Sequence, residues 1–187
     1  MIYNQPSRTL GVAISSSNHG RDGEIFVAAF SLDAKDSEYR RTKLNQRRRR
    51  ENASKGLENM GTLFFKVDLE DYSFYGNSIH SEIANSFYKC INQYMQFDST
   101  RLFFNTELRT NYREEVKIYL KRLLKLPYPM VSVQSITKKN SSKTLKTNNL
   151  LDHADYTSNF LFRQPEFDTS DPSRRAFPKK ISFPFRF

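Results

Sequence analysis

The sequence predicts an α/β protein in which a mixed five-stranded sheet is flanked by helices. Three observations lead to this prediction. Short apolar runs indicate strands, longer segments with apolar residues three and four positions apart indicate helices, and the two kinds alternate in the second half of the chain. With 187 residues, the chain suits one domain with its own hydrophobic core.

Three strands are expected first. Residues 10–15 and 24–32 are apolar runs separated by a glycine-containing segment, which predicts two antiparallel strands joined by a turn. In residues 61–69, Leu63, Phe65, Val67 and Leu69 alternate with other residues, so a third strand is expected there. Three consecutive strands predict an antiparallel meander.

Helices and strands then alternate. Residues 78–96 have a helical apolar stripe that includes Tyr94, and residues 112–126 have another that includes Tyr119. Strands are expected at 101–108 and 130–136, and a last helix at 148–163. Each later strand should lie parallel to the first through a right-handed crossover.

The predicted domain therefore spans residues 1–163, with an insertion at about 37–60 and a tail at 164–187. The insertion is expected to be an exposed hairpin extension or a mobile arm, because its tandem cations repel one another. The tail contains four prolines and five phenylalanines. We expect it to be an extended strap on the domain or on a protein partner, with disorder as the alternative.

The charge of the chain predicts a partner rich in phosphate. Thirty Lys and Arg against twenty Asp and Glu give a net charge of +10, and seven cations lie within residues 40–50. Such a concentration favours contact with the backbone of RNA or DNA, although a solvated loop or a nuclear-localisation-like tract would have the same composition. The candidate nucleic-acid-binding residues are Arg40, Arg41, Lys43, Arg47, Arg48, Arg49, Arg50, Lys138, Lys139, Lys143 and Lys146.

Several classes of protein are disfavoured. The single cysteine, Cys90, rules out an internal disulfide framework and a multi-cysteine zinc site. No apolar run is long enough to span a membrane, and the first residues do not have the pattern of a secretory signal. We therefore expect the protein in the cytoplasm, or inside an organelle if the gene is encoded there. The histidines have no zinc-ligand spacing, and His153 is expected at a helix surface.

The segment "LLDHADYTSNFLFR" places Asp152 and Asp155 three positions apart in an apolar, helix-like run. Carboxylates are among the residues least often buried, so the pair requires an explanation. The two side chains are either ligands of a divalent metal or carboxylates that hydrogen-bond the neighbouring loop or pair with its lysines.

The order of elements resembles the ribonuclease H-like superfamily. Within it, the chain is similar to a family of uncharacterised microbial proteins that open with Asp-Glu-Ser-Gly and close with an Ala-Asp helix preceded by a Ser/Lys loop. Residues 131–163 match the closing pattern, with Ala154 and Asp155 at the Ala-Asp positions. This resemblance implies phosphodiester cleavage by two divalent metals, Mg²⁺ or Mn²⁺, held by acids on the first strand, on the last helix, and near the first helix or at the end of the fourth strand.

The opening pattern differs. Ser15, Ser16, Ser17 and Asn18 stand where the family has Asp-Glu-Ser-Gly, and the fourth strand ends near Asn105, with Glu107 two residues further on. The sequence therefore predicts a degenerate metal site. The candidate catalytic residues are Asp155, Asp152 and Glu107, and the candidate metal ligands are Asp155 and Asp152.

Three functions follow from these features. The favoured one is a nucleic-acid-binding protein with an inactive site that holds the phosphate backbone through its arginine-rich arm. The second is a Mg²⁺- or Mn²⁺-dependent nuclease that uses Asp155 and a relocated acid. The third is an architectural subunit of a ribonucleoprotein assembly.

Overall fold

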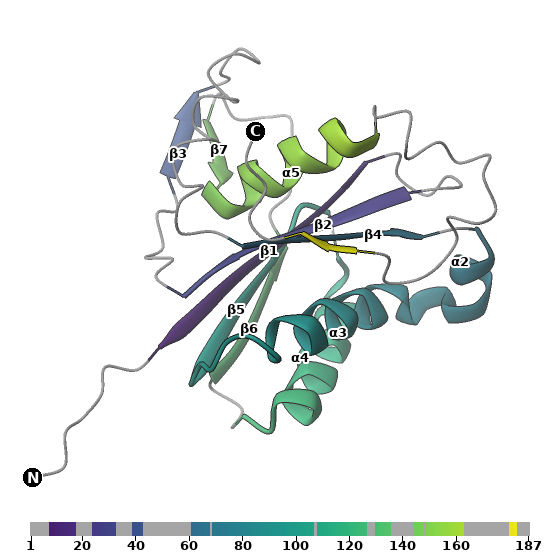
Figure 1. Ribbon diagram of the computed structural model, residues 1–187, viewed down its shortest axis with the longest axis vertical. Coiled ribbons are helices and arrows are strands. Elements are labelled where there is room, and N and C mark those ends of the chain that lie inside the picture. The colour runs from purple at the N-terminus through teal and green to yellow at the C-terminus, as the bar shows by residue number, and fades with distance from the viewer. Residues whose placement is uncertain are drawn as a thin grey trace, which may run out of the picture.

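The computed structural model describes residues 8–17, 24–32, 39–42, 61–67, 69–106, 108–126, 130–135, 144–147, 149–162 and 180–182. These residues form an α/β arrangement, with one large sheet between two layers of helices (Figure 1). The greater part of the predicted insertion (43–60) and of the predicted tail (164–179 and 183–187) lies outside the described residues.

All five predicted strands form and lie in the large sheet. They are β1 (Thr9–Ser17), β2 (Glu24–Ser31), β4 (Gly61–Val67), β5 (Ser99–Phe104) and β6 (Val131–Ser135). The strand order is β6-β5-β1-β2-β4-β8. The first three form the expected antiparallel meander, while β5 is parallel to β1 and β6 is parallel to β5.

The prediction of five strands was incomplete. A sixth strand, β8 (Lys180–Ser182), pairs antiparallel with the outer edge of β4. It belongs to the proline- and phenylalanine-rich tail, in which no strand was predicted. The outer edge of an unpaired strand presents backbone N–H and C=O groups without partners, and β8 pairs with part of that edge of β4.

The three predicted helices are α3 (Ile79–Ile91), α4 (Thr110–Leu124) and α5 (Asn149–Phe162). Helices α3 and α4 pack on one face of the sheet, and α5 packs alone on the other (Figure 1). Helix α4 ends where Lys125 adopts a left-handed conformation with φ of 54°. The expected strand at 61–69 is too long, because Leu69 begins a further helix, α2 (Leu69–Tyr75), which is followed by a 3-10 turn, η2 (Gly76–Ser78).

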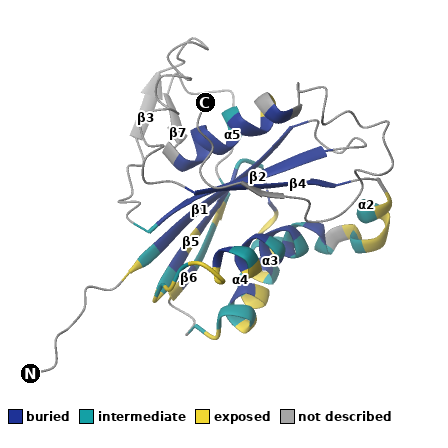
Figure 2. Ribbon diagram, in the orientation of Figure 1, coloured by how far each residue is buried: buried dark blue, intermediate teal, exposed yellow. Residues whose placement is uncertain are grey.

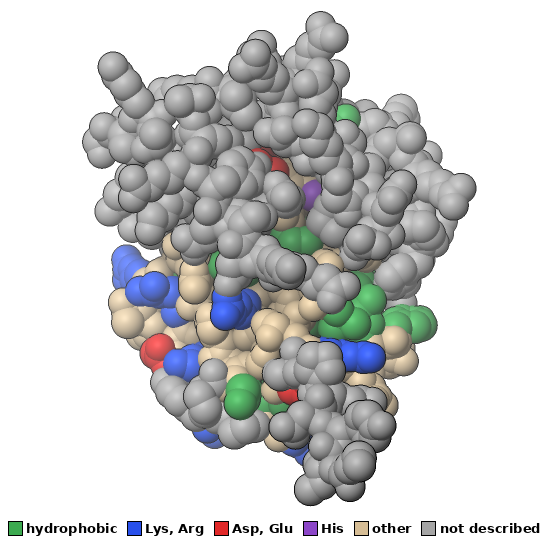
Figure 3. Space-filling model, turned by 90° about the vertical axis from the view of Figure 1, so that its left-hand side faces the viewer, with side chains coloured by type: hydrophobic (Ala, Val, Ile, Leu, Met, Phe, Trp, Pro, Cys, Tyr) green, Lys and Arg blue, Asp and Glu red, His purple; other side chains and the backbone are tan. Residues whose placement is uncertain are grey.

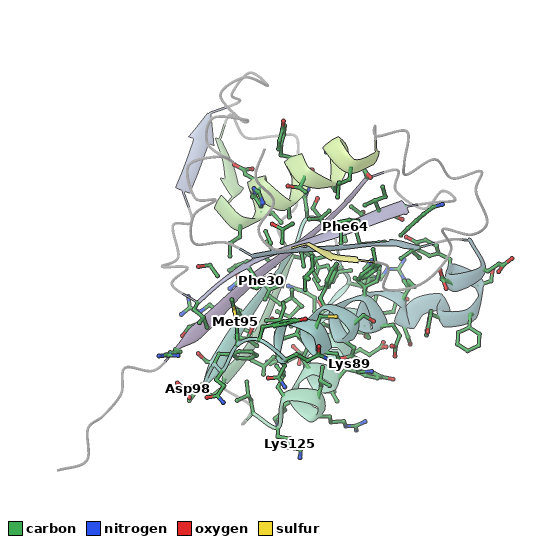
Figure 4. All side chains as sticks on the ribbon, in the orientation of Figure 1. Phe30, Phe64, Lys89, Met95, Asp98 and Lys125 are labelled. Carbon is green, nitrogen blue, oxygen red and sulfur yellow. The ribbon has the colours of Figure 1, made fainter. Side chains whose placement is uncertain are left out.

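Alternation along the strands divides the core into two parts. Phe26 and Phe30 of β2 pack in the larger cluster with α3 and α4, whereas Val27 of the same strand packs in the cluster under α5. Figure 4 shows this division, with Phe30 and Phe64 on opposite sides of the sheet. Burying one such side chain contributes roughly 1.5–3 kcal/mol, so both faces stabilise the central strands.

Two aromatic residues do not face inward as predicted. Tyr94 lies beyond the end of α3 and is 60% exposed, because the helix ends at Ile91 rather than at residue 96. Tyr119 of α4 is 37% exposed, beside the buried Leu120. Figure 2 shows the contrast between the buried central strands and the partly exposed outer surfaces of α2 and α4. No helix among the described residues has the length and hydrophobicity to cross a membrane.

A separate two-stranded sheet joins two basic segments. Strand β3 (Tyr39–Thr42) lies in the predicted insertion, and β7 (Thr144–Thr147) lies in the Ser/Lys segment that was expected to be a loop. They pair antiparallel, with Arg40 opposite Lys146 and Thr42 opposite Thr144. In Figure 1, this small sheet lies beside the first turn of α5.

Candidate functional site

Three polar side chains from different elements meet where β1 and β5 end. Asn105 Nδ2 lies 3.1 Å from Asp155 Oδ1 and 3.1 Å from Ser15 Oγ, and it donates to both. Ser15 Oγ also donates to Asp155 Oδ1, at 3.4 Å. The hydroxyl, the amide and the carboxylate thus form a closed triangle, which we call the Ser15–Asn105–Asp155 triangle.

The sheet register explains this meeting. Ile14 of β1 is aligned with Phe104 of β5, so the next residues of the two parallel strands, Ser15 and Asn105, are also neighbours. The backbone N–H of Asn105 donates to the carbonyl of Ile14 at 3.0 Å, which extends the pairing just past the end of β5. Residues two apart on a strand share a face, so Ser15 lies on the α5 side with Ala13.

Asp155 is fixed by its own helix. Ser158 Oγ and Asn159 Nδ2 donate to the backbone carbonyl of Asp155 at 3.0 and 2.6 Å. Its helix packs on β1 and β2 through Leu151, Ala154 and other residues of the smaller cluster. The carboxylate therefore stands over the end of β1 on a helix that is anchored by hydrophobic contacts.

Asp152 and His153 lie three and two residues before Asp155 in α5. Asp152 is 7% exposed and His153 is 1% exposed. His153 Nε2 lies 3.0 Å from Thr62 Oγ1 of β4, so the expectation that His153 lies at the helix surface was wrong. It is a buried histidine that connects α5 to the far side of the meander.

The face of the sheet that carries the triangle also carries a lysine. Lys66 of β4 is aligned with Ile25 of β2, which in turn is aligned with Ser17 of β1, so the three form one row across the sheet. Lys66 is 7% exposed and follows Phe64, which packs under α5. Because residues two apart share a face, Lys66 lies on the α5 side of the sheet.

A second polar cluster lies on the opposite face, near the start of β2. The Tyr72 hydroxyl donates to the carboxylate of Glu24, which is 3% exposed. Burial raises the pKa of Tyr72, and the hydrogen bond to Glu24 and its charge raise it further. The His80 ring makes an edge contact with Phe104, with 5.9 Å between the ring centroids.

The same cluster sets the protonation of His80. Burial lowers the pKa of His80 from its ordinary value, while the negative charges of Glu24 and Glu115 act in the opposite direction. Glu115 reaches this region from α4 and accepts a hydrogen bond from Ser81 Oγ at 3.2 Å. Burial is the largest of these effects, so the neutral imidazole is favoured.

The residues of the triangle do not fit a two-metal centre. Two close dications require several anionic oxygen ligands, and the triangle supplies one carboxylate. The oxygen Oδ1 of that carboxylate already accepts hydrogen bonds from an amide and a hydroxyl, neither of which carries a negative charge. Across the described part of the chain, no three His, Cys, Asp or Glu side chains are grouped so as to hold a metal ion.

The remaining predicted site residues are only partly described. Glu107 lies outside the described residues, as do Lys43, the four arginines 47–50, Lys138, Lys139 and Lys143. Arg40 and Arg41 lie in β3, and Lys146 lies in β7. The sequence analysis missed Lys66, although a single lysine between Phe65 and Val67 in an apolar strand was a signal that could have identified it.

The chain is similar in backbone to solved structures. No protein-family model matches the chain, and no curated protein matches it. A chain in the structure of the PCNA:RNase HII complex from Archaeoglobus fulgidus is similar in backbone, with 16% sequence identity and a TM-score of 0.49. The similarity covers 82% of this chain and 72% of that chain.

Proposed function

We propose that this chain is a ribonuclease H-like protein that binds the phosphate backbone of RNA or DNA and has lost the two-metal centre of that fold. The strand order and directions support the first part. An antiparallel meander of β1, β2 and β4 is followed by β5 and β6, both parallel to β1, with the closing helix α5 on the opposite face from α3 and α4.

The Ser15–Asn105–Asp155 triangle is the observation on which the proposal depends. In open α/β sheets, ligands bind beyond the carboxyl ends of the strands, where the connections change direction. Strand β1 is such a position, because β2 and β4 extend the sheet on one side of it and β5 and β6 extend it on the other. Among the described residues, the triangle at this position holds one carboxylate, that of Asp155, and Lys66 lies on the same face of the sheet.

The distribution of charge supports nucleic acid as the ligand. The net charge is +10, and the arm at residues 40–50 holds seven of the cations. Each Lys or Arg placed on a phosphate releases condensed counterions, which gives binding a strong dependence on salt. Figure 3 shows further Lys and Arg side chains on the described surface, in the lower half that contains β5, β6 and α4. Cations on this surface can therefore be replaced in a control variant that loses the same charge as an arm variant.

The test compares two variants that lose the same charge. In the arm variant, Arg47, Arg48, Arg49 and Arg50 are replaced by Ala. In the control variant, the replaced residues are Lys89, Lys117, Lys121 and Arg122 of α3 and α4. Affinity for labelled single-stranded RNA, single-stranded DNA and duplex DNA of equal length is measured over a range of salt concentrations.

We expect the arm variant to bind all sequences more weakly. For each phosphate contact removed, the salt-dependence slope should fall by about 0.9 on duplex DNA and by about 0.7 on single strands. The control variant should lose much less of both. Equal losses in the two variants would show that only net charge matters, and binding that does not change with salt would refute the proposed contact with the phosphate backbone.

A further inference from the structure

The two basic segments of the chain meet in the small sheet. Arg40 and Arg41 belong to the insertion between β2 and β4, whereas Lys146 belongs to the segment between β6 and α5. The register places Arg40 opposite Lys146 and Arg41 opposite Leu145. Segments that are distant in the sequence, and that we had predicted as an arm and a loop, are therefore adjacent strands of one ribbon.

The sequences of the two strands do not have the pattern of a sheet with one buried face. Neither "YRRT" nor "TLKT" has an alternating apolar pattern, and two cationic residues occupy directly opposed positions. Like charges at directly opposed positions destabilise an antiparallel pair. An anionic ligand that contacts both strands would reverse the sign of this contribution.

The position of the ribbon connects it to the triangle. A single residue separates the end of β7 at Thr147 from the start of α5 at Asn149, and α5 carries Asp155. In Figure 1, both strands of the ribbon lie at this end of α5. A polymer held by the ribbon would therefore lie close to the helix that completes the triangle over the ends of β1 and β5.

We propose that β3 and β7 act as one element, a two-stranded ribbon that binds a single stretch of nucleic-acid backbone with cations from both strands. This inference rests on the proposed function and adds a location to it. Arg40 and Lys146 contribute jointly, because the backbone pairing fixes the distance between their positions. The phosphate groups of the ligand offset the repulsion between the two strands.

A double-variant cycle tests the joint action. The variants are Arg40→Ala, Lys146→Ala and the two combined, with Arg122→Ala of α4 as the control. Affinity is measured for single-stranded RNA, single-stranded DNA and duplex DNA of equal length, which also shows whether the ribbon prefers one kind of backbone. Circular dichroism and the thermal midpoint confirm that each variant is folded.

Each single variant should lower the affinity several-fold and reduce the salt-dependence slope by about 0.9 on duplex DNA and by about 0.7 on single strands. The combined variant should lose less than the product of the two single losses, because both residues act on the same stretch of backbone. Arg122→Ala should change the affinity less than twofold. Losses that multiply independently would overturn the inference.

A crosslink tests the ribbon without removing a cation. Thr42 and Thr144 are opposed in the register. Opposed residues of antiparallel strands have Cα atoms about 4.5–5.5 Å apart, within the range for a disulfide. Cysteines at both positions, in a Cys90→Ser background, should form a disulfide on oxidation, and the oxidised protein should bind at least as tightly as the reduced one. A cysteine pair at Thr42 and Thr110 should not crosslink.

The outcomes separate this inference from the proposed function. Failure of the unmodified protein to bind any of the three nucleic acids would refute both. Binding that depends on the four arginines 47–50, combined with independent losses in the cycle or with affinity lost on oxidation, would refute the ribbon alone. A disulfide that does not form would also contradict the register.

Discussion

Asn105 Nδ2 donates a hydrogen bond of 3.1 Å to Asp155 Oδ1, and this contact joins the end of β5 to α5. An amide and a carboxylate have nearly the same shape, but the amide supplies a donor and the carboxylate a negative charge. Asn105 therefore stabilises the single charge of Asp155 within the protein. An aspartate at the same place would leave two negative charges facing each other.

The variant Asn105→Asp tests this relationship. It removes the donor and places a second carboxylate beside Asp155, so the free energy of unfolding should fall by roughly 1–3 kcal/mol at neutral pH. Lowering the pH should recover part of this loss, because one proton shared between close carboxylates relieves the repulsion. Urea denaturation at several pH values measures both effects.

The matched control is Asn111→Asp, in the first turn of α4, where Asn111 is exposed. A negative charge near the start of a helix is neutral or slightly stabilising, so this variant should keep its stability. If the two variants lose the same free energy at every pH, the contact between Asn105 and Asp155 does not have the role assigned to it.

The combined variant Ser15→Asp with Asn105→Asp tests the loss of the metal site. It supplies carboxylates on β1 and after β5 beside Asp155, which gives hard cations several anionic ligands. We expect Mn²⁺ to raise the thermal midpoint of this variant, since a metal at 100 times its dissociation constant stabilises by about 2.7 kcal/mol. The unmodified protein should show no such shift.

Cleavage assays with Mn²⁺ complete this test. The unmodified protein should leave single-stranded RNA, single-stranded DNA and duplex DNA intact. If it cuts any of them, and Asp155→Ala removes the activity, the chain is a metal-dependent nuclease and our proposal is wrong. A rise in the thermal midpoint with Mn²⁺ that Asp155→Ala removes would likewise favour a retained metal site.

Much of the large sheet could be predicted because residues that are close together in the sequence indicate its strands and the helices beside it. The alternation of Leu63, Phe65 and Val67 indicates a buried face of β4. The regular apolar spacing of α3 indicates the side of that helix that packs against the sheet. These strands and helices are marked by patterns within short windows of the sequence. Asn105 and Asp155 were expected at one site only through the resemblance to the ribonuclease H-like superfamily, which places site residues at the end of the fourth strand and on the last helix.

What could not be predicted depends on partners that are distant in the sequence. His153 is buried, and its Nε2 lies 3.0 Å from Thr62 Oγ1 of β4. Nothing near His153 in the sequence indicates that contact. Strands β3 and β7 have no hydrophobic alternation to mark them, so only their mutual pairing makes them strands. Local patterns cannot report contacts of this kind.

A buried chain of hydroxyls offers a test of how α3 is fixed to the sheet. The Tyr88 hydroxyl lies 2.6 Å from Thr100 Oγ1, which donates to the carbonyl of Leu10 at 3.0 Å. Tyr88→Phe removes one hydrogen bond and leaves Thr100 bonded to Leu10, so it should lower the free energy of unfolding by about 1 kcal/mol. Urea denaturation measures this value.

Thr100→Val should be more damaging, although it also removes only one hydroxyl. It leaves the buried Tyr88 hydroxyl without its acceptor, which costs about 1–3 kcal/mol, and it also removes a hydrogen bond to the Leu10 carbonyl. The combination of Tyr88→Phe with Thr100→Val should therefore lose less than the sum of the single losses. Additive losses would count against the hydrogen-bonded chain.

His80 predicts how stability depends on pH. Burial lowers the pKa of its imidazole below the ordinary value of 6.5, while Glu24 and Glu115 partly oppose the shift. The unfolded chain then binds a proton more readily than the folded one. Stability contributed by the neutral imidazole is present above 6.5 and falls as the pH drops from 6.5 towards the lower folded pKa, below which the loss is complete.

The variant His80→Gln removes this titration, so the stability of the unmodified protein should fall relative to that of the variant as the pH is lowered through this window. Glu24→Gln keeps an acceptor for the Tyr72 hydroxyl but removes the charge that favours the imidazolium. It should therefore lower the pKa of His80 further and extend the window to lower pH. The two effects can be separated by following the imidazole resonance of His80 by NMR alongside urea denaturation. A pKa of His80 above 6.5, or one that rises in Glu24→Gln, would contradict both the dominance of burial and the sign assigned to Glu24.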